Sequence, residues 1–157
     1  MNYRLWLTIG LIAIVVSVPI ASAAGTSLSI ATNPLGKIVV NSKGLTAYFY
    51  DLDKANSGVS VCTGGCATNW PAIISTSKTP RLAGIKGKVT VLPGTKQIAI
   101  NGRPIYTFIG DSTRGSTNGQ GVGGVWYVIS PSGVELKPVA SAKPSFSPTP
   151  TISPTPI

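Results

Sequence analysis

The ten residues from position 62 to 71 constrain this chain more than any other stretch of similar length. They contain both cysteines, Cys62 and Cys66, two adjacent glycines, and the pair Trp70-Pro71. The cysteines are four positions apart, and the glycines between them permit the tight turn that a bond between the sulfurs requires. Thiols of exported proteins are oxidised, and the first 23 residues, described below, have the layout of an export signal, so we predict a Cys62–Cys66 disulfide that shapes this corner and fixes how Trp70 enters the core.

Two other roles for the cysteines have weaker support. A redox-active dithiol would make the protein an envelope redox or electron-transfer accessory, but the spacing is not Cys-x-x-Cys and no nearby His or Lys lowers a thiol pKa. A metal site would need further soft ligands, which the chain lacks. We therefore expect no metal and no cofactor, and we keep the redox role of Cys62 and Cys66 as the alternative.

Residues 1–23 have the layout of an export signal. Arg4 gives a positive start, residues 5–20 are apolar, and Ala21-Ser22-Ala23 forms an A-x-A cleavage site. Cleavage removes Arg4 and takes the net charge from +9 to +8. The alternative is an uncleaved anchor, which would be the protein's membrane contact. The signal predicts a secreted protein or one at the extracytoplasmic cell surface.

The charged residues exclude several kinds of chemistry. The chain has no histidine, so histidine acid–base catalysis, Ser-His-Asp and Cys-His sites and histidine metal sites are impossible. Its acids are Asp51, Asp53, Asp111 and Glu135. An enzyme that uses Asp51, Asp53 or Asp111 would need two carboxylates that flank one cleft, so we expect the protein not to be an enzyme.

The positive charge suggests anionic partners without identifying one. The lysines are spread singly, and no basic run alternates with aromatic residues, so we expect no nucleic-acid binding. Anionic envelope polymers or other surface proteins remain possible partners, and a basic solvated surface is the simplest interpretation.

The central part of the chain has the signals of an all-β, mainly antiparallel fold built from hairpins, with at most a short helical turn. Gly, Asn and Pro separate short β-branched or aromatic runs, and Asn101-Gly102 is a strong two-residue hairpin signal. We predict a hairpin of residues 36–41 and 45–50 and a helical turn within 67–73. Further strands are expected at 88–92, 96–100, 104–109 and 125–129.

A weak internal repeat divides the domain. Residues 45–51 resemble residues 104–111: each is an aromatic strand that ends near an Asp and is followed by a glycine-containing loop and a tryptophan, Trp70 or Trp126. We predict two related half-units around one core, because neither alone could bury its apolar face.

The predicted organisation follows from the signal, the repeat and the composition of the C-terminal end. We expect a signal peptide (1–23), a lead segment (24–33), a β domain (34–137) with half-units at about 34–75 and 88–131, and a Pro/Ser/Thr-rich tail (138–157) that is extended.

Several side chains are candidates for binding. Exposed tyrosine rings can stack on sugars, although burial in the core is the simpler role. Asp111 with Asn118 could hold a cation, but a brace within the loop is the default. Residues 51–58 resemble a calcium loop without its glycine and closing Glu, so we expect a solvated turn. The candidates for binding are Tyr48, Tyr50, Tyr106, Tyr127, Asp111 and Asn118, and the expected structural anchors are Trp70, Trp126, Gly123 and Gly124.

Three segments carry a family resemblance. Residues 35–40, the Cys-x-Gly-x-Cys-x-x-x-Trp-Pro pattern at 62–71, and the segment 118–127 with Gly-x-Gly-Gly-x-Trp-Tyr resemble the bacterial and archaeal secreted repeat of unknown function, over residues 34–131. The resemblance implies an exported, lipoprotein-like β module with tandem half-repeats and brings no enzyme activity. The lipid-attachment cysteine of many members is missing here. We therefore predict a non-enzymatic structural or binding module of the cell envelope.

Overall fold

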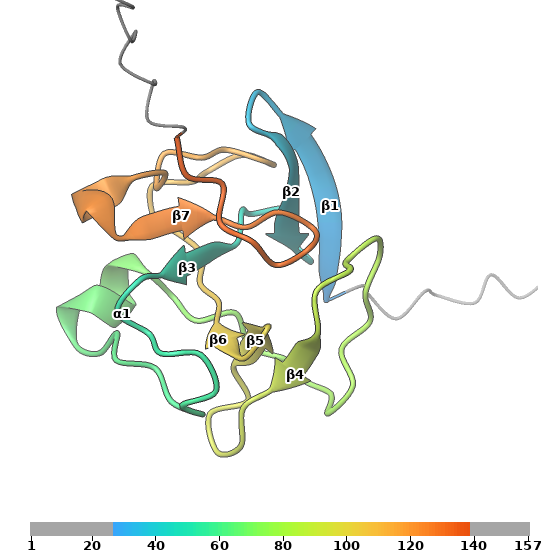
Figure 1. Ribbon diagram of the computed structural model, residues 1–157, viewed down its shortest axis with the longest axis vertical. Coiled ribbons are helices and arrows are strands. Elements are labelled where there is room, and N and C mark those ends of the chain that lie inside the picture. The colour runs from blue at the N-terminus through green and yellow to red at the C-terminus, as the bar shows by residue number, and fades with distance from the viewer. Residues whose placement is uncertain (1–26, 139–157) are drawn as a thin grey trace, which may run out of the picture.

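The computed structural model describes residues 27–138 as a β-rich domain with very little helix (Figure 1). One short helix, α1 (Gly65–Asn69), and a 3₁₀ turn at Val122–Gly124 interrupt the strands. The strands are β1 (Leu28–Asn33), β2 (Gly36–Asn41), β3 (Tyr48–Tyr50), β4 (Val89–Val91), β5 (Ile98–Ile100), β6 (Arg103–Pro104) and β7 (Trp126–Val128). All strand pairs are antiparallel, so the predicted fold class is confirmed.

The two ends of the sequence lie outside the described residues. These are the predicted signal peptide at 1–23 and nearly all of the predicted tail, residues 139–157. Within residues 27–138, no helix is long and apolar enough to cross a membrane.

The first hairpin differs from the one that we predicted. β2 pairs over its full length with β1, from Leu28 opposite Asn41 to Asn33 opposite Gly36. The stretch 24–33 is therefore not a simple lead, because it contributes a strand and the buried side chain of Leu28. Leu28 and Ile30 alternate with polar residues, as in a half-buried strand, but the signal is weakened by Ala31 and Asn33, whose types are depleted in strands. The chain does turn back after β2, where Asn41 Oδ1 accepts a hydrogen bond from Leu45 N, but only the isolated pair Val40–Thr46 forms there.

The second hairpin follows its turn residues. Asn101 and Gly102 both have positive φ, 51° and 79°, and join β5 to β6 as predicted. The return strand is shorter than the expected 104–109, because the chain keeps its hydrogen bonds to β5 only as far as Ile105, whose N donates to Ile98 O at 3.0 Å. Beyond that point Tyr106 pairs with the first half-unit instead.

The half-units exchange strand pairings. In the β3–β7 pair, Tyr48 of the first half-unit lies opposite Val128 of the second. Tyr106 of the second lies opposite Ala72 of the first. The two tyrosines also pair with each other, through Tyr48 N to Tyr106 O at 2.8 Å and Tyr106 N to Tyr48 O at 3.1 Å. The aromatic segment of each half-unit thus pairs with residues at or just after the tryptophan of the other, in β7 on one side and at the isolated pair Ala72–Tyr106 on the other.

The alternation of side chains along β3 separates two hydrophobic clusters. Ala47 and Phe49 belong to a largely aliphatic cluster, whereas Tyr48 belongs to an aromatic one that contains both Trp70 and Trp126. Since both clusters take residues from both half-units, the predicted shared core is confirmed.

The exchange of strands predicts that the domain unfolds as one unit. We expect Trp126→Ala to destabilise it by about 3–5 kcal/mol and to lower amide protection equally in β2 and β5, since each half-unit completes the other. Hydrogen exchange measured by NMR tests this. Leu52→Ala is the control because that side chain is 58% exposed. A variant that loses protection only between residues 88 and 130 would contradict the interlocked core.

Candidate functional site

A column of four aromatic rings, three of them stacked and the fourth tilted, lies at the centre of the domain. The rings of Trp70 and Trp126 are parallel, with an interplanar angle of 1° and centroids 3.8 Å apart. Tyr50 stacks on the outer face of Trp126 at 4.2 Å, and Phe108 lies against Trp70 at 4.4 Å. Each half-unit supplies two of the four rings, so the column joins the two halves face to face.

Two tyrosines border this column edge-on. Tyr48 meets Trp70 and Tyr106 meets Trp126, each with ring centroids 5.3 Å apart and nearly perpendicular planes. This edge-to-face geometry is one of the two favoured for aromatic pairs. Each half-unit therefore has one edge-to-face contact between its tyrosine and its tryptophan. This match is what an approximate two-fold symmetry between the half-units would produce.

The burial of these rings limits what they can bind. Trp70 and Trp126 are 5% and 4% exposed, and Tyr48 and Tyr106 are almost fully buried. None of these four rings offers a free face to a sugar. Tyr50 and Tyr127 are half-buried, and Lys137 Nζ lies 4.6 Å from the centroid of Tyr127.

A glycine that the sequence analysis did not single out packs against the column. At Gly119, a Cβ atom would come within 2.7 Å of the Trp70 ring, so no larger residue fits. Gly123 and Gly124, which we expected to be anchors, are exposed and shape the 3₁₀ turn with positive φ. The adjacent Asn118-Gly119 pair was the available signal for this close approach.

Each buried tyrosine donates a hydrogen bond to an aspartate of the other half-unit. Tyr48 Oη lies 2.6 Å from Asp111 Oδ2, and Tyr106 Oη lies 2.5 Å from Asp53 Oδ2. The second carboxylate oxygens accept backbone hydrogen bonds, Asp53 from Val61 N and Asp111 from Asn118 N. The two carboxylates therefore brace loops across the half-units.

The structure corrects how the two repeats correspond. Asp53, rather than Asp51, matches Asp111, since each follows its tyrosine by five residues and makes the same contacts. The loop at 51–58 is not simply a solvated turn, because Asp53 is only 3% exposed. Asn118 adds a side-chain hydrogen bond to Gly110 O. No group of three His, Cys, Asp or Glu side chains that could hold a metal occurs among the described residues.

Burial changes the titration of these pairs. Burial, and then the hydrogen bond to Asp111, raises the pKa of Tyr48 far above its ordinary value. Burial and Asp53 raise the pKa of Tyr106 in the same way. Burial also raises the pKa of Asp111, against the hydrogen bonds from Tyr48 and Asn118. Both phenols stay protonated throughout the physiological range, which keeps their hydrogen bonds intact.

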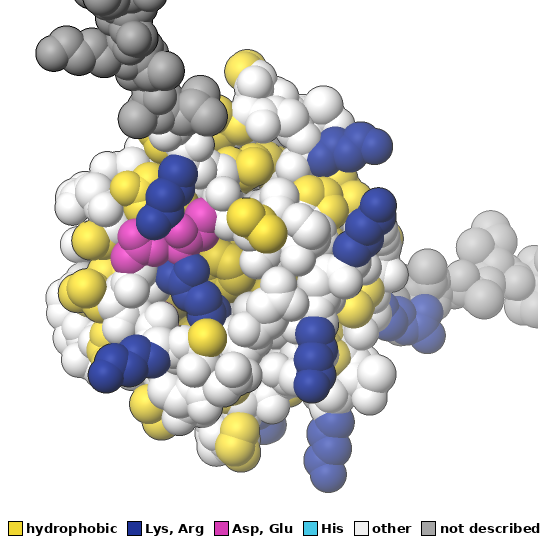
Figure 2. Space-filling model, viewed as in Figure 1, with side chains coloured by type: hydrophobic (Ala, Val, Ile, Leu, Met, Phe, Trp, Pro, Cys, Tyr) yellow, Lys and Arg dark blue, Asp and Glu magenta, His cyan; other side chains and the backbone are white. Residues whose placement is uncertain are grey.

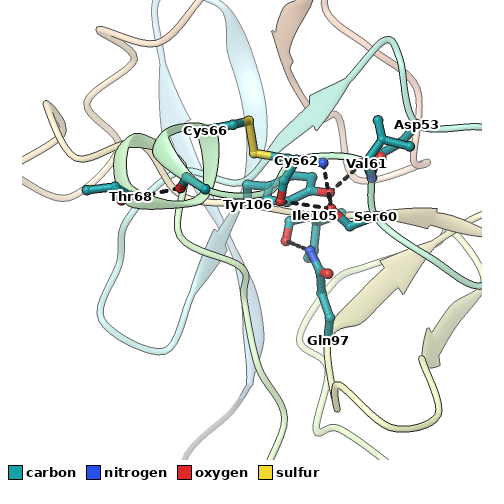
Figure 3. Close-up of a disulfide and its surroundings, with 10 residues drawn as sticks. Asp53, Ser60, Val61, Cys62, Cys66, Thr68, Gln97, Ile105 and Tyr106 are labelled. Atoms are coloured by element: carbon teal, nitrogen blue, oxygen red, sulfur yellow. Dashed lines mark hydrogen bonds between the residues drawn. A yellow bond between two sulfur atoms is a disulfide. The ribbon is translucent and has the colours of Figure 1, made fainter.

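The predicted disulfide is present next to one of these pairs. Cys62 and Cys66 are bonded with Cα atoms 5.2 Å apart, and Trp70 N donates to Cys66 O at the end of α1. Figure 3 shows Cys62 beside Ser60, whose Oγ lies 2.6 Å from Tyr106 Oη; since the phenol proton is donated to Asp53, the Ser60 hydroxyl is the donor in this contact. The disulfide therefore secures the loop that leads from the buried aspartate to Trp70.

The other two acids form an ion cluster with two basic residues. Arg103 pairs with Glu135 and, at 3.4 Å, with Asp51, and its guanidinium lies 4.4 Å from the centroid of the Phe49 ring. Lys137 Nζ lies 2.9 Å from Asp51 and 3.0 Å from Glu135. Figure 2 shows the acidic side chains gathered in one patch with basic side chains against it.

The remaining basic residues are arranged differently. No carboxylate pairs with them within residues 27–138. They are Lys37, Lys43, Lys54, Lys78, Arg81, Lys86, Lys88, Lys96 and Arg114. Two of the chain's four acids are buried and accept hydrogen bonds from tyrosines, and the other two are paired in the ion cluster. The net positive charge of the surface is therefore carried by these separate cations.

The fold and these contacts define a β module made of two interlocked half-repeats. The chain belongs to the family described as secreted repeat of unknown function, whose model matches residues 29–73 and 88–130. The two matches coincide with the two half-units, and the family places the protein outside the cytoplasm. Comparison with curated proteins and with solved structures gave no match.

The tyrosine–aspartate pairs predict non-additive mutations. We expect Tyr48→Phe to cost about 1–3 kcal/mol because it leaves the buried Asp111 oxygen without its donor. Asp111→Asn should cost a similar amount, and the double variant less than the sum. Denaturant unfolding measures all three, with Tyr127→Phe as the control. Full additivity would show that the hydrogen bond contributes nothing.

The disulfide predicts a moderate effect on stability. Replacing both cysteines, as Cys62→Ser with Cys66→Ser, should lower the free energy of unfolding by about 2 kcal/mol, because the bond closes only a short loop, and should preserve the fold. Thermal unfolding and the NMR spectrum test this. Loss of the folded spectrum would contradict it. The redox role of the pair stays a prediction, which a measured reduction potential would test.

Proposed function

We propose that the protein is a non-enzymatic binding module of the cell envelope that associates with anionic polymers through its positive surface. One observation carries this proposal. All acidic side chains are occupied by internal partners, whereas the cations named above have no carboxylate partner within residues 27–138. Such a surface has a positive electrostatic potential, which attracts polyanions.

The position of the acids also argues against carboxylate catalysis. Asp53 and Asp111 are buried, and both oxygens of each accept hydrogen bonds from the domain itself. Asp51 and Glu135 share Arg103 and Lys137. Neither pair has a carboxylate free to exchange a proton with a substrate. A binding role fits this arrangement better than an enzymatic one.

The spacing of the cations favours an extended partner. Figure 2 shows separate basic side chains distributed over the face rather than one basic patch. A single exposed ion pair contributes about 0–1 kcal/mol, so a small anion that meets one lysine binds weakly. A flexible polymer with repeated negative charges can reach several of these lysines at once.

Salt tests the proposal directly. We expect the purified protein to bind inorganic polyphosphate at 0.1 M NaCl and to bind it at least about tenfold more weakly at 1 M, where the Debye length falls from about 10 Å to about 3 Å. Isothermal titration calorimetry measures the affinity, and uncharged dextran is the control polymer.

Matched variants separate charge from side-chain size. Lys37→Glu with Lys86→Glu should weaken polyphosphate binding, whereas arginine at the same two positions should preserve it. Binding that is unaffected by salt, or equal in both double variants, would contradict a role for the positive surface.

A further inference from the structure

A cavity of about 560 Å³ lies between two loops of the domain. One wall is the segment after the disulfide corner, which includes Thr76, Ser77 and Lys78. The other is the turn that joins β4 to β5, which includes Pro93 and Lys96. The cavity therefore combines hydroxyl groups, an apolar wall and the ammonium groups of Lys78 and Lys96, which are the two charged residues that line it.

The two lysines are available to a ligand. Lys78 and Lys96 are both exposed and lack carboxylate partners within the described residues. They come from segments on opposite sides of the cavity, and the two walls are joined where Ser75 N donates to Lys96 O at 2.9 Å. An anion between the walls would meet positive charge from both sides.

Lys96 also has an unfavourable backbone conformation. Its φ is 58°, in the left-handed region. The other non-glycine residues with positive φ among the described residues are Asn56 and Asn101, and asparagine tolerates this region better than lysine does. In the first half-unit, the positive φ beside the turn from β1 to β2 belongs to a glycine, Gly36, at 101°. A lysine at position 96 thus costs stability that glycine would not, which is typical of a residue kept for function.

We propose that this cavity is the site that recognises one repeat unit of the polymer, namely a phosphate attached to a polyol. The ammonium groups of Lys78 and Lys96 bind the phosphate as point charges, which is how lysine commonly binds phosphate. Thr76 and Ser77 supply hydroxyl groups for the polyol, and Pro93 contacts its carbon chain. This inference rests on the proposed function and adds a specific site to its general attraction for polyanions.

The conformation of Lys96 gives a test that separates binding from folding. We expect Lys96→Gly to raise the midpoint of thermal unfolding, because glycine adopts the left-handed region freely, and at the same time to weaken binding. A merely structural residue would lower both. A variant that lowers the midpoint would overturn the strain argument, and one that leaves the affinity unchanged would remove Lys96 from the site.

The binding partner for the test is a glycerol phosphate oligomer, with inorganic polyphosphate of equal charge for comparison. We expect Lys78→Ala with Lys96→Gly to weaken binding of the oligomer by about tenfold or more and to affect polyphosphate less. Lys54→Ala with Lys88→Ala removes the same charge from exposed positions outside the cavity and should change the affinity by no more than about threefold.

The outcomes separate this site from the proposed function. If both double variants weaken oligomer binding equally, attraction is general, the site is overturned and the proposed function stands. If Lys78→Ala with Lys96→Gly weakens polyphosphate binding as strongly as oligomer binding, the polyol is not recognised and the site is again overturned. If the unmodified protein binds neither polyanion, the proposed function itself fails.

Discussion

The stacking of Trp70 on Trp126 is the contact on which the rest of the structure depends. It joins the two half-units at 3.8 Å with parallel planes, and the flanking rings of Tyr50 and Phe108 extend the column to both sides. A half-unit alone would lose both ring contacts of its tryptophan in the column, since Trp70 lies against Trp126 and Phe108 and Trp126 against Trp70 and Tyr50, and would leave its aromatic strand without a partner. The two repeats are therefore not separate beads on a chain, because each supplies surfaces that only the other can cover.

Because the two half-units are held together by the aromatic column, the loops that precede their tryptophans can differ. The first half-unit holds the loop before its tryptophan with the Cys62–Cys66 disulfide and α1, whereas the second uses a glycine-rich loop and a 3₁₀ turn. Both loops also begin at an aspartate that accepts a hydrogen bond from a buried tyrosine of the other half-unit. The aromatic column and these hydrogen bonds fix the tryptophans in both halves, so the disulfide reinforces one corner without defining the fold.

Local chemistry was predictable from the sequence, whereas long-range partners were not. Asn101-Gly102 forms the expected turn because two positive φ angles suit those residues. We did not predict β1, because Ala31 and Asn33 are residue types depleted in strands and interrupt its alternating pattern, and because its pairing depends on β2. Asp53 was assigned to a solvated turn because nothing local indicates its bond to Tyr106, a residue 53 positions away. The repeat was visible, but the exchange of strands between its halves depends on packing.

The burial of the acids connects the fold with the surface. Asp53 and Asp111 are needed inside to accept hydrogen bonds from tyrosines, and Asp51 and Glu135 are occupied by Arg103 and Lys137. With only four acids in the chain, this internal use leaves no negative charge to balance the exposed lysines. The interactions that lock the two half-units together thus also make the exterior positive. A polyanion would then meet a surface whose charge follows directly from how the core is held.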